Sequence, residues 1–499
     1  MKIYKYLIGL ISLSMLSACS DWLDIQPQDT TEDDQLFETG EGFRNALNGV
    51  YRQMAGSSMY GKELTWGALD AMANYYTPST GTTEYYFSRY QYTGSYAYPV
   101  IQSFWSTSYN CIANCNNLIQ RTQKEPVTTF MKGADEKNVI LGEALALRAI
   151  LHFDIMRLFA SAQMDDPIKQ IPFVDVYPCT FKEYATNEEV SDLIIKDLKQ
   201  AKELLAKFDV PRISWLLPDV RWENDYQRLM SSSQEEVEVP DDLFFAYRSY
   251  RLNYYAICGM LARVYLYKGM YEEAFRETEI VLNAVSERHK EYVFDFTNSR
   301  DMADGNSKLY NEIIFALSNQ RLEEDYRTYR SGSEKLYLSN WSPLNGWFAG
   351  DANDIRYKLL VEEGWDYYNS KYLPAEGTLK KFAVDIIPML RLGEMYYIRA
   401  EYYNHLSLAE NLEPDAKEAL RKQALEEFAK VRRGHGCNQE YVSTSGGDAW
   451  FNRELLNEAR REFMGEGQLF FYYKRLGVKV PGMGDTKNFV LPYPQNEAL

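Results

Sequence analysis

The fold is decided by the stretch ARVYLYKGMYEEA, residues Ala262 to Ala274, where one predicted helix is followed directly by another. Gly269 is expected to end the first helix, because the residue after a helix often takes a left-handed conformation that suits glycine. Ala274 is small, so the second helix can approach the first closely. The stretch therefore predicts two helices packed against each other across a tight turn.

A helix pair of this form matches the tetratricopeptide pattern, in which Tyr-x-x-Gly ends one helix and x-Tyr-x-x-Ala opens the next. Apolar residues at helical spacing predict further helices on both sides of the pair. These predicted helices cover 143–159, 188–208, 243–267, 272–282, 388–406 and 414–431. They can stack as degenerate repeats, although their spacing is far from a regular 34 residues. We therefore predict an all-α dominated fold.

Long irregular stretches separate the predicted helices, at 56–100, 209–242 and 290–385. They contain Pro, Gly, Ser, Asn and many aromatic residues. Loops longer than about 15 residues inside a compact protein usually have a function. We expect the functional residues of this chain in these stretches.

The composition restricts the kinds of partner. Of 499 residues, 45% are hydrophobic and 25% charged, as in a folded globular protein. The net charge is −17, and no run of basic residues exceeds two, which argues against nucleic acid as a partner. The 40 Tyr residues favour contact surfaces, because a tyrosine packs its ring while its hydroxyl reaches water or a ligand. Amphipathic tyrosines on helix faces are an equally good explanation.

The N-terminus has the form of an export signal. A positively charged start precedes an apolar run, 6–17, that is too short to span a hydrocarbon core of about 30 Å. The run ends in Leu16-Ser17-Ala18-Cys19, a lipobox. We predict a signal peptide over 1–18, lipidation of Cys19 and a tether over 19–40, with the acyl chains as membrane anchor. The alternative is a plain secreted protein with a chance cysteine.

Five other cysteines remain, an odd count that argues against a full disulfide framework outside the cytoplasm. Cys111 and Cys115 are four residues apart and share one face of a helix. They are either small core residues or half of a metal site or a disulfide. A second half-site with His or Cys spacing is missing from the sequence, so we predict no metal.

Catalytic motifs are missing as well. The sequence has no HExxH, Gly-x-Ser-x-Gly, P-loop or Rossmann fingerprint. His152 lies in an apolar helix and is interpreted as a core histidine. His435 and Cys437 could form a nucleophilic pair, but their context does not support one. Paired carboxylates for glycoside hydrolysis leave no motif, so the sequence alone does not exclude them. We predict neither catalysis nor a cofactor.

Seven motifs in the same order resemble the SusD/RagB family of surface glycan-binding lipoproteins, over nearly the whole chain. The motifs are Asp21–Pro27, Gly142–Ala160, Ala262–Ala274, Glu312–Leu317, Pro388–Glu401, Glu458–Gly467 with the following Lys474–Gly477, and Leu491–Glu497. The chain departs from the family pattern at Ser161, where the family has Gly, at Ala459 and at Phe471–Tyr473. The ligand-binding loops do not align by motif, so the resemblance does not identify the ligand.

The resemblance implies an α-helical domain over 41–499, with an N-terminal part of about 41–240 and a C-terminal part of about 241–499. It further implies about four tetratricopeptide-like helix pairs and an irregular segment that carries the ligand site. Such a protein covers a TonB-dependent β-barrel transporter of the SusC type at the outer membrane, facing the cell exterior, and binds its ligand without cleaving it. Asp21 and Asp24 resemble the signals that place such lipoproteins on the surface. Some family members bind peptides instead of glycans, and a structural or host-interaction role is a further alternative.

Two charged sets resemble structural positions of the family. They are Arg391, Glu394, Arg399 and Glu401, and Glu458, Arg460, Arg461 and Glu462. We interpret both as ion pairs that hold helices together, so that changing Arg391 or Glu401 harms folding before it harms binding.

Two aromatic loops offer the chemistry that sugars need, rings for the apolar C–H faces and amides or carboxylates for the hydroxyls. One loop covers 70–90, and the other covers 340–348, ahead of the family's Asp-x-Arg motif at 354–356. The candidate ligand-binding residues are Asn74, Tyr75, Tyr76, Tyr85, Trp341 and Trp347. The alternative for each is that it packs a loop or contacts the transporter.

Overall fold

The computed structural model describes residues 34–217, 240, 242–331, 335–339, 342–373, 377, 384–439 and 449–495. The lipobox with Cys19, most of the expected tether and Trp341 lie outside these residues.

The α-helices are α3 (Gly40–Met54), α4 (Ala68–Met72), α5 (Thr83–Ser88), α6 (Tyr98–Lys124), α7 (Gly133–Phe159), α8 (Asn187–Asp209), α11 (Leu243–Ala246), α12 (Tyr254–Lys268), α13 (Tyr271–Leu282), α14 (Ser299–Ala303), α15 (Leu322–Ser331), α16 (Pro343–Gly346), α18 (Leu392–Ser407), α19 (Pro414–Gly434), α20 (Trp450–Glu462) and α21 (Leu469–Leu476). The 3-10 helices are η1 (Val127–Thr129), η2 (Val210–Leu216), η3 (Tyr310–Glu312), η4 (Ile355–Leu359) and η6 (Thr486–Phe489). The strands are β1 (Ile171–Pro172), β2 (Tyr184–Ala185), β3 (Val285–Ser286), β4 (Glu291–Tyr292), β5 (Ile313–Ser318), β6 (Leu360–Glu363), β7 (Asp366–Asn369) and β8 (Ile386–Arg391).

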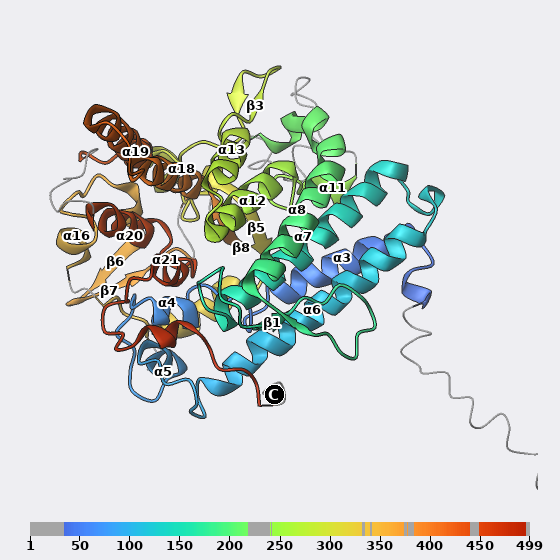
Figure 1. Ribbon diagram of the computed structural model, residues 1–499, viewed down its shortest axis with the longest axis horizontal. Helices are drawn as coiled ribbons and strands as arrows, with labels where there is room; N and C mark the ends of the chain where they lie inside the picture. Colours follow the sequence, from blue (N-terminus) through green and yellow to red (C-terminus); the bar gives the residue numbers. More distant parts are fainter. Residues whose placement is uncertain are drawn as a thin grey trace, which may run out of the picture.

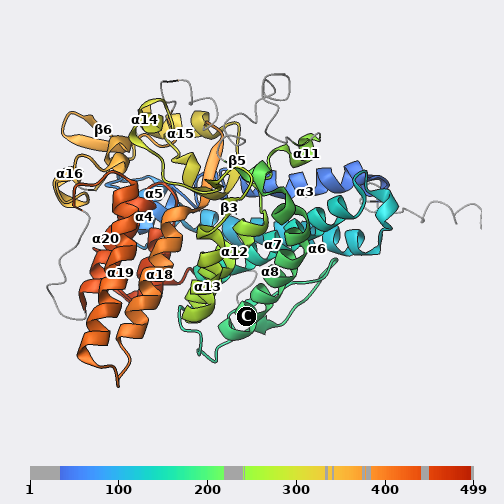
Figure 2. The same cartoon turned by 90° about the horizontal axis from the view of Figure 1, so that it is seen from above.

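The long helices form a continuous row, in which each helix packs on the next. The order is α3, α6, α7, α8, α12, α13, α18 and α19. Figure 2 shows α18, α19 and α20 at one end of the molecule and α3, α6 and α7 at the other. The loops with α16, β6 and β7 lie at the end that carries α20 (Figure 1). This row of helix pairs confirms the predicted fold class.

The turn between α12 and α13 has the predicted form. Gly269 follows α12 in a left-handed conformation, with φ 81° and ψ 13°. Its N–H donates to the carbonyls of Leu266 and Tyr265, which satisfies the end of the helix. Ala274 is fully buried on α13.

The predicted continuous helix over 243–267 is wrong, because α11 and α12 are separate helices. The Asn253 side chain accepts a hydrogen bond from the Ala256 N–H and caps the start of α12. In the turn before it, the buried Arg248 side chain pairs with Asp209 at 2.7 Å. An asparagine cap and a buried ion pair thus interrupt an otherwise apolar helical pattern.

The predicted helix over 388–406 begins four residues late, at Leu392. The preceding residues form β8, which pairs antiparallel with β5, and Pro388 lies opposite Ala316. Every residue of β8 is buried. The periodicity of a short, fully buried apolar run is compatible with both a strand and a helix. Here the pairing with β5 makes the run a strand. Since β5, α15 and the hairpin β6–β7 all lie within 290–385, that stretch is also less irregular than expected.

One hydrophobic cluster of buried side chains extends from Phe37 to Leu491 and includes residues of both halves of the chain. The division of the chain into a signal peptide, a tether and one domain over 41–499 stays a prediction. Cys111 and Cys115 belong to the hydrophobic cluster, and both are free thiols within the described part of the chain. In the same part, no helix combines the length and the apolar composition needed to cross a bilayer.

A buried network of charges joins β8 to its neighbours. Arg391 is fully buried and contacts Glu312 at 3.0 Å, Glu462 at 2.7 Å and Glu466 at 2.8 Å. Arg356 contacts the other carboxylate oxygen of Glu462 at 2.7 Å. Buried carboxylates tolerate desolvation only when they are paired in this way. The network confirms the structural interpretation of Arg391 and Glu462.

The other members of the two charged sets, except Arg460, are also paired, Arg399 with Glu427 at 3.3 Å. Glu394 contacts Arg263 and Glu401 contacts Arg475, each at 2.6 Å. Glu458 contacts Arg432 at 2.6 Å and Arg461 at 2.5 Å.

We predict that Arg391→Met costs about 3–5 kcal/mol of unfolding free energy, because it leaves three buried carboxylates without their shared cation. Urea denaturation followed by circular dichroism measures the loss. Arg276→Met is the control, since its pair with Glu272 is largely exposed, and we expect a change within about 0.5 kcal/mol. Equal losses in both variants would contradict a structural role for Arg391.

His152 makes the stability depend on pH. Its Nδ1 donates to the Arg148 carbonyl at 2.9 Å, and its Nε2 accepts from the Val174 N–H at 2.9 Å, so the neutral ring is fully bonded. Burial, above all, lowers the pKa of His152 to about 3. Between about pH 6.5 and pH 3 the unfolded chain binds a proton that the folded chain does not, so stability falls as the pH falls.

We expect His152→Gln to weaken this acid sensitivity, by up to about 1.4 kcal/mol per pH unit, although the variant starts less stable at pH 8. Urea midpoints at pH 8, 6, 5 and 4 measure the slope. His405→Gln, at an exposed ring on α18, is expected to keep the slope of the parent chain. Parallel slopes for all three proteins would refute the assignment to His152.

Candidate functional site

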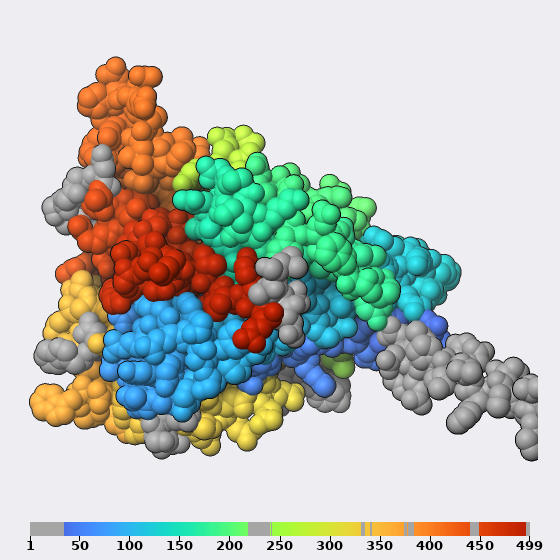
Figure 3. Space-filling model, turned by 60° about the horizontal axis from the view of Figure 1, so that its bottom comes forward, coloured from blue at the N-terminus to red at the C-terminus, as the bar shows by residue number. Residues whose placement is uncertain are grey.

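Three segments that are far apart in the sequence pair like strands at the loop end of the molecule. Tyr76 forms an antiparallel bridge with Leu338. The Ser339 N–H donates to the Tyr75 carbonyl at 2.7 Å, and the Leu338 N–H donates to the Tyr367 carbonyl of β7 at 2.8 Å. The first aromatic loop is thus joined through 335–339 to the hairpin β6–β7. Figure 3 shows the blue segments of α4 and α5 directly beside the yellow and orange segments that follow β5.

Asp70 fixes the first loop to the C-terminal part of the chain. Its buried carboxylate accepts hydrogen bonds from the N–H groups of Gly465 at 2.7 Å and Gly467 at 3.1 Å. Gly467 has φ 71°, and a Cβ there would lie 2.4 Å from the Leu64 carbonyl oxygen. Only glycine therefore fits this close approach between the loop and the turn before α21.

Arg460 brings three of the predicted ligand-binding residues together. Its guanidinium lies 5.2 Å from the ring centre of Tyr75 and 5.3 Å from that of Trp347. The two rings meet edge to face, with centres 5.8 Å apart. Arg460 also approaches the Asn74 carbonyl at 3.4 Å, and Arg461 donates to the Trp347 carbonyl at 2.7 Å. This arginine was interpreted as part of an ion-pair set, but here it supports the loops.

The predicted residues differ in how much surface they expose. Tyr75 and Tyr76 are 0% and 2% exposed, and the Tyr75 hydroxyl donates to the Arg460 carbonyl at 2.7 Å. Burial raises the pKa of both phenols well above the usual value, so both are neutral hydroxyls. In this structure both rings pack the loop from within. Asn74 and Trp347 are half-buried. Contact with a ligand stays a prediction for all four residues.

Tyr85 belongs to a separate tyrosine cluster on α5 and the segment after it. Its ring meets Tyr86 edge to face at 5.5 Å, and Tyr86 stacks on Tyr96 at 4.7 Å with the planes 9° apart. Tyr96 is 45% exposed, while Tyr85 and Tyr86 are half-buried. The sequence analysis identified Tyr85 as a candidate and did not single out its two partners.

Trp365 is a candidate that the sequence analysis missed. It occupies the two-residue turn of the hairpin β6–β7, directly after Gly364, and is 86% exposed. Gly364 has φ 69°, as the first position of such a turn requires. The contact between Phe348 and Tyr357, at 5.5 Å, places the hairpin's entry beside α16. The signal in the sequence was a glycine between two short runs of strand-forming residues.

One group of side chains has the composition of a metal site. Among the described residues, the ligand atoms of Glu312, His435 and Glu462 lie within 4.8 Å of one another, and all three residues are buried. Arg391 contacts both carboxylates, and Arg356 contacts Glu462. Two guanidinium groups therefore already contact the carboxylates, and their positive charges would repel a divalent cation at this position. We assign the group to the structural network.

Comparisons with known proteins agree with this architecture. Residues 21–211 match a SusD-like family model described as "Starch-binding associating with outer membrane", and residues 365–492 match the model of the SusD family. Two proteins of Formosa agariphila are related. SusD-like protein P38 is 26% identical over 39% of this chain and 36% of its own length. SusD-like protein P2 is 24% identical over 82% of this chain and 69% of its own length.

Solved structures share the fold. A SusD superfamily protein of Bacteroides thetaiotaomicron superposes with a TM-score of 0.66 at 20% identity, covering 92% of this chain and 97% of that one. A laminarin-binding SusD-like protein superposes with a TM-score of 0.62 at 17% identity, covering 91% and 96%. With the row of helix pairs and the two matched family models, these likenesses establish that the chain belongs to the SusD/RagB family.

Proposed function

We propose that this protein captures glycans at the cell surface and passes them to a TonB-dependent outer-membrane transporter. The observation that carries the proposal is the pairing of the loop at 74–77 with 335–339 and β7. This pairing holds Trp365 in an exposed position beside the segment that carries Trp347. Exposed rings on firmly held loops suit the apolar faces of sugars, and nearby amides and carbonyls suit their hydroxyls.

The comparisons add two supports for a glycan ligand. The family model over 21–211 carries starch binding in its description, and a protein of the same fold is described as laminarin-binding. Starch and laminarin therefore serve as the first two probes. We propose Trp365 and Trp347 as the ring platforms, and Trp341, Asn74, Tyr85, Tyr86 and Tyr96 as further candidate ligand contacts.

The site of action follows from the N-terminal sequence. Lipidation of Cys19 would anchor the chain, and Asp21 and Asp24 would direct it outward. The family model's description includes association with the outer membrane, which supports this placement. A partner of the SusC type would then receive the ligand from the loop end of the helix row.

We further propose that the protein does not cleave its ligand. The two fully buried histidines are held in structural roles, His152 between Arg148 and Val174, and His435 against Glu312 at 3.2 Å. Burial raises the pKa of Cys437 to about 12, which opposes the thiolate that a nucleophile needs.

We predict that Trp365→Ala weakens glycan binding at least tenfold, the equivalent of about 1.4 kcal/mol, because it removes an exposed ring platform without opening the core. Affinity gel electrophoresis of the full chain in detergent, with starch or laminarin in the gel, measures the retardation. Phe181→Ala is the control, since Phe181 is 76% exposed in the segment between β1 and β2. We expect it to migrate like the parent chain.

Two other results would change the proposal. If neither polysaccharide nor any of a wider glycan panel retards the chain, but a mixture of peptides binds, the protein captures peptides and the rings are loop packing. If both alanine variants migrate like the parent in a gel that retards all three, the ligand binds elsewhere on the molecule.

A further inference from the structure

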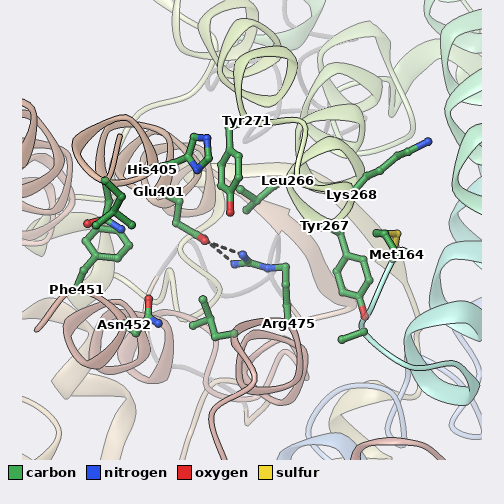
Figure 4. Close-up of a pocket in the computed structure, with 15 residues that line it drawn as sticks. Met164, Leu266, Tyr267, Lys268, Tyr271, Glu401, His405, Phe451, Asn452 and Arg475 are labelled. Carbon is green, nitrogen blue, oxygen red and sulfur yellow. Dashed lines mark hydrogen bonds and ion pairs between the residues drawn. The ribbon is translucent and has the colours of Figure 1, made fainter. Parts of the chain in front are cut away.

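The row of helices contains a cavity that shares no lining residue with the aromatic loops. Its volume is about 450 Å³, within the range of small-ligand sites, about 300–1,000 Å³. It lies where the turn between α12 and α13 meets the end of α18, the start of α20 and the end of α21 (Figure 4). Met164 and Ala162, from the segment after α7, close one side.

An ion pair lies at the centre of the cavity lining. Arg475 donates two hydrogen bonds to Glu401, each at 2.6 Å, and the side chains keep 12% and 5% of their surface exposed. Figure 4 shows the pair among the labelled side chains, with the Tyr271 ring above it. The free edges of such a pair offer donors and acceptors side by side, the pattern that neighbouring hydroxyl groups complement. Because the two charges cancel, the pair favours a neutral ligand over an anion or a cation.

Aromatic rings form another part of the lining. Tyr271 and His405 stack with their centres 4.0 Å apart and their planes 11° apart. His405 is exposed, and the neighbouring Leu408 is 51% exposed, so this part of the lining offers apolar surface to solvent. Burial raises the pKa of Tyr271, which therefore lines the cavity as a neutral hydroxyl. Asn404 and Asn452 add amide groups.

We propose that this cavity is a second binding site, for one neutral sugar residue. The inference rests on the proposed glycan-binding function and adds a place on the helix row that is separate from the loops. Stacked rings, a self-neutralised ion pair and two amides together match a ring-shaped ligand with several hydroxyl groups. The charged Lys268 on the rim pairs with Asp192 of α8, so its positive charge does not give the cavity a preference for anions.

The test uses His405 as a local reporter, because the chain has four histidines and two of them are fully buried. The methyl glycosides of glucose, galactose, mannose and xylose are titrated into the full chain in detergent. Nuclear magnetic resonance follows the imidazole signals, which His405→Gln and His289→Gln assign. We expect at least one glycoside to shift the His405 signal in a saturable way and to leave that of His289, on the hairpin β3–β4, unchanged.

Asn452→Ala then tests the amide lining. Asn452 lines the cavity and is exposed, so we expect unchanged stability but a roughly 2- to 10-fold weaker glycoside titration, as for one lost hydrogen bond. Asn457→Ala is the matched control, because Asn457 is exposed on the same helix α20 and does not line the cavity, and it should titrate like the parent chain. Trp365→Ala should also leave the His405 titration unchanged, because it alters only the loop site.

The outcomes separate the two proposals. If polysaccharide retards the parent chain but no glycoside shifts His405, the second site is refuted and the proposed function stands. A shift of His405 that Asn452→Ala leaves at full strength also refutes the site, because the sugar would not contact the amide lining. If no sugar binds in either assay, both proposals fail.

Discussion

The guanidinium of Arg391 is the interaction on which the rest of the structure depends. It is fully buried at the end of β8 and faces carboxylates from η3, α20 and the turn that follows α20. The carboxylates come from two distant parts of the chain, Glu312 from one and Glu462 and Glu466 from the other, and each would be costly to bury alone. The shared cation therefore couples the small sheet β5–β8, the helix row and the C-terminal segment. Arg356 and Lys371 extend the coupling to the loop region through Glu462 and Glu466.

Much of the helix row could be predicted from the sequence. Gly269 and Ala274 correctly predicted the turn between α12 and α13. Apolar residues at helical spacing correctly predicted α7, α8 and α19. Prediction failed where tertiary contacts override the local pattern. Pro388 lies in a buried apolar run that could form either a strand or a helix, and only its pairing with β5 makes it a strand. Arg248 interrupts a helical period because Asp209, far away in sequence, pairs with it.

The candidate site was less predictable, for a physical reason. Residue types predicted that the aromatic loops form the ligand site. The exposure of each side chain, however, depends on tertiary packing, which a local sequence pattern does not encode. Tyr75 and Tyr76 are buried because Arg460, Asp70 and the segment 335–339 enclose them. Trp365, outside the two aromatic loops considered, is exposed because a two-residue turn leaves its side chain without neighbours on one side. Arg460 contributes through planar contact with rings, a role that its charge alone did not indicate.

The hydrogen bonds from the N–H groups of Gly465 and Gly467 to Asp70 also affect the order in which the parts of the molecule reach their final structure. The first aromatic loop is made early in synthesis, yet the groups that fix it are made almost four hundred residues later. A chain that stops before α20 contains the loop but lacks both the backbone that holds Asp70 and the arginine that contacts Tyr75 and Trp347. The loop end of the molecule, with its proposed ligand site, is therefore completed only when the last part of the chain has been made. An incomplete product would lack the contacts that hold this proposed site together.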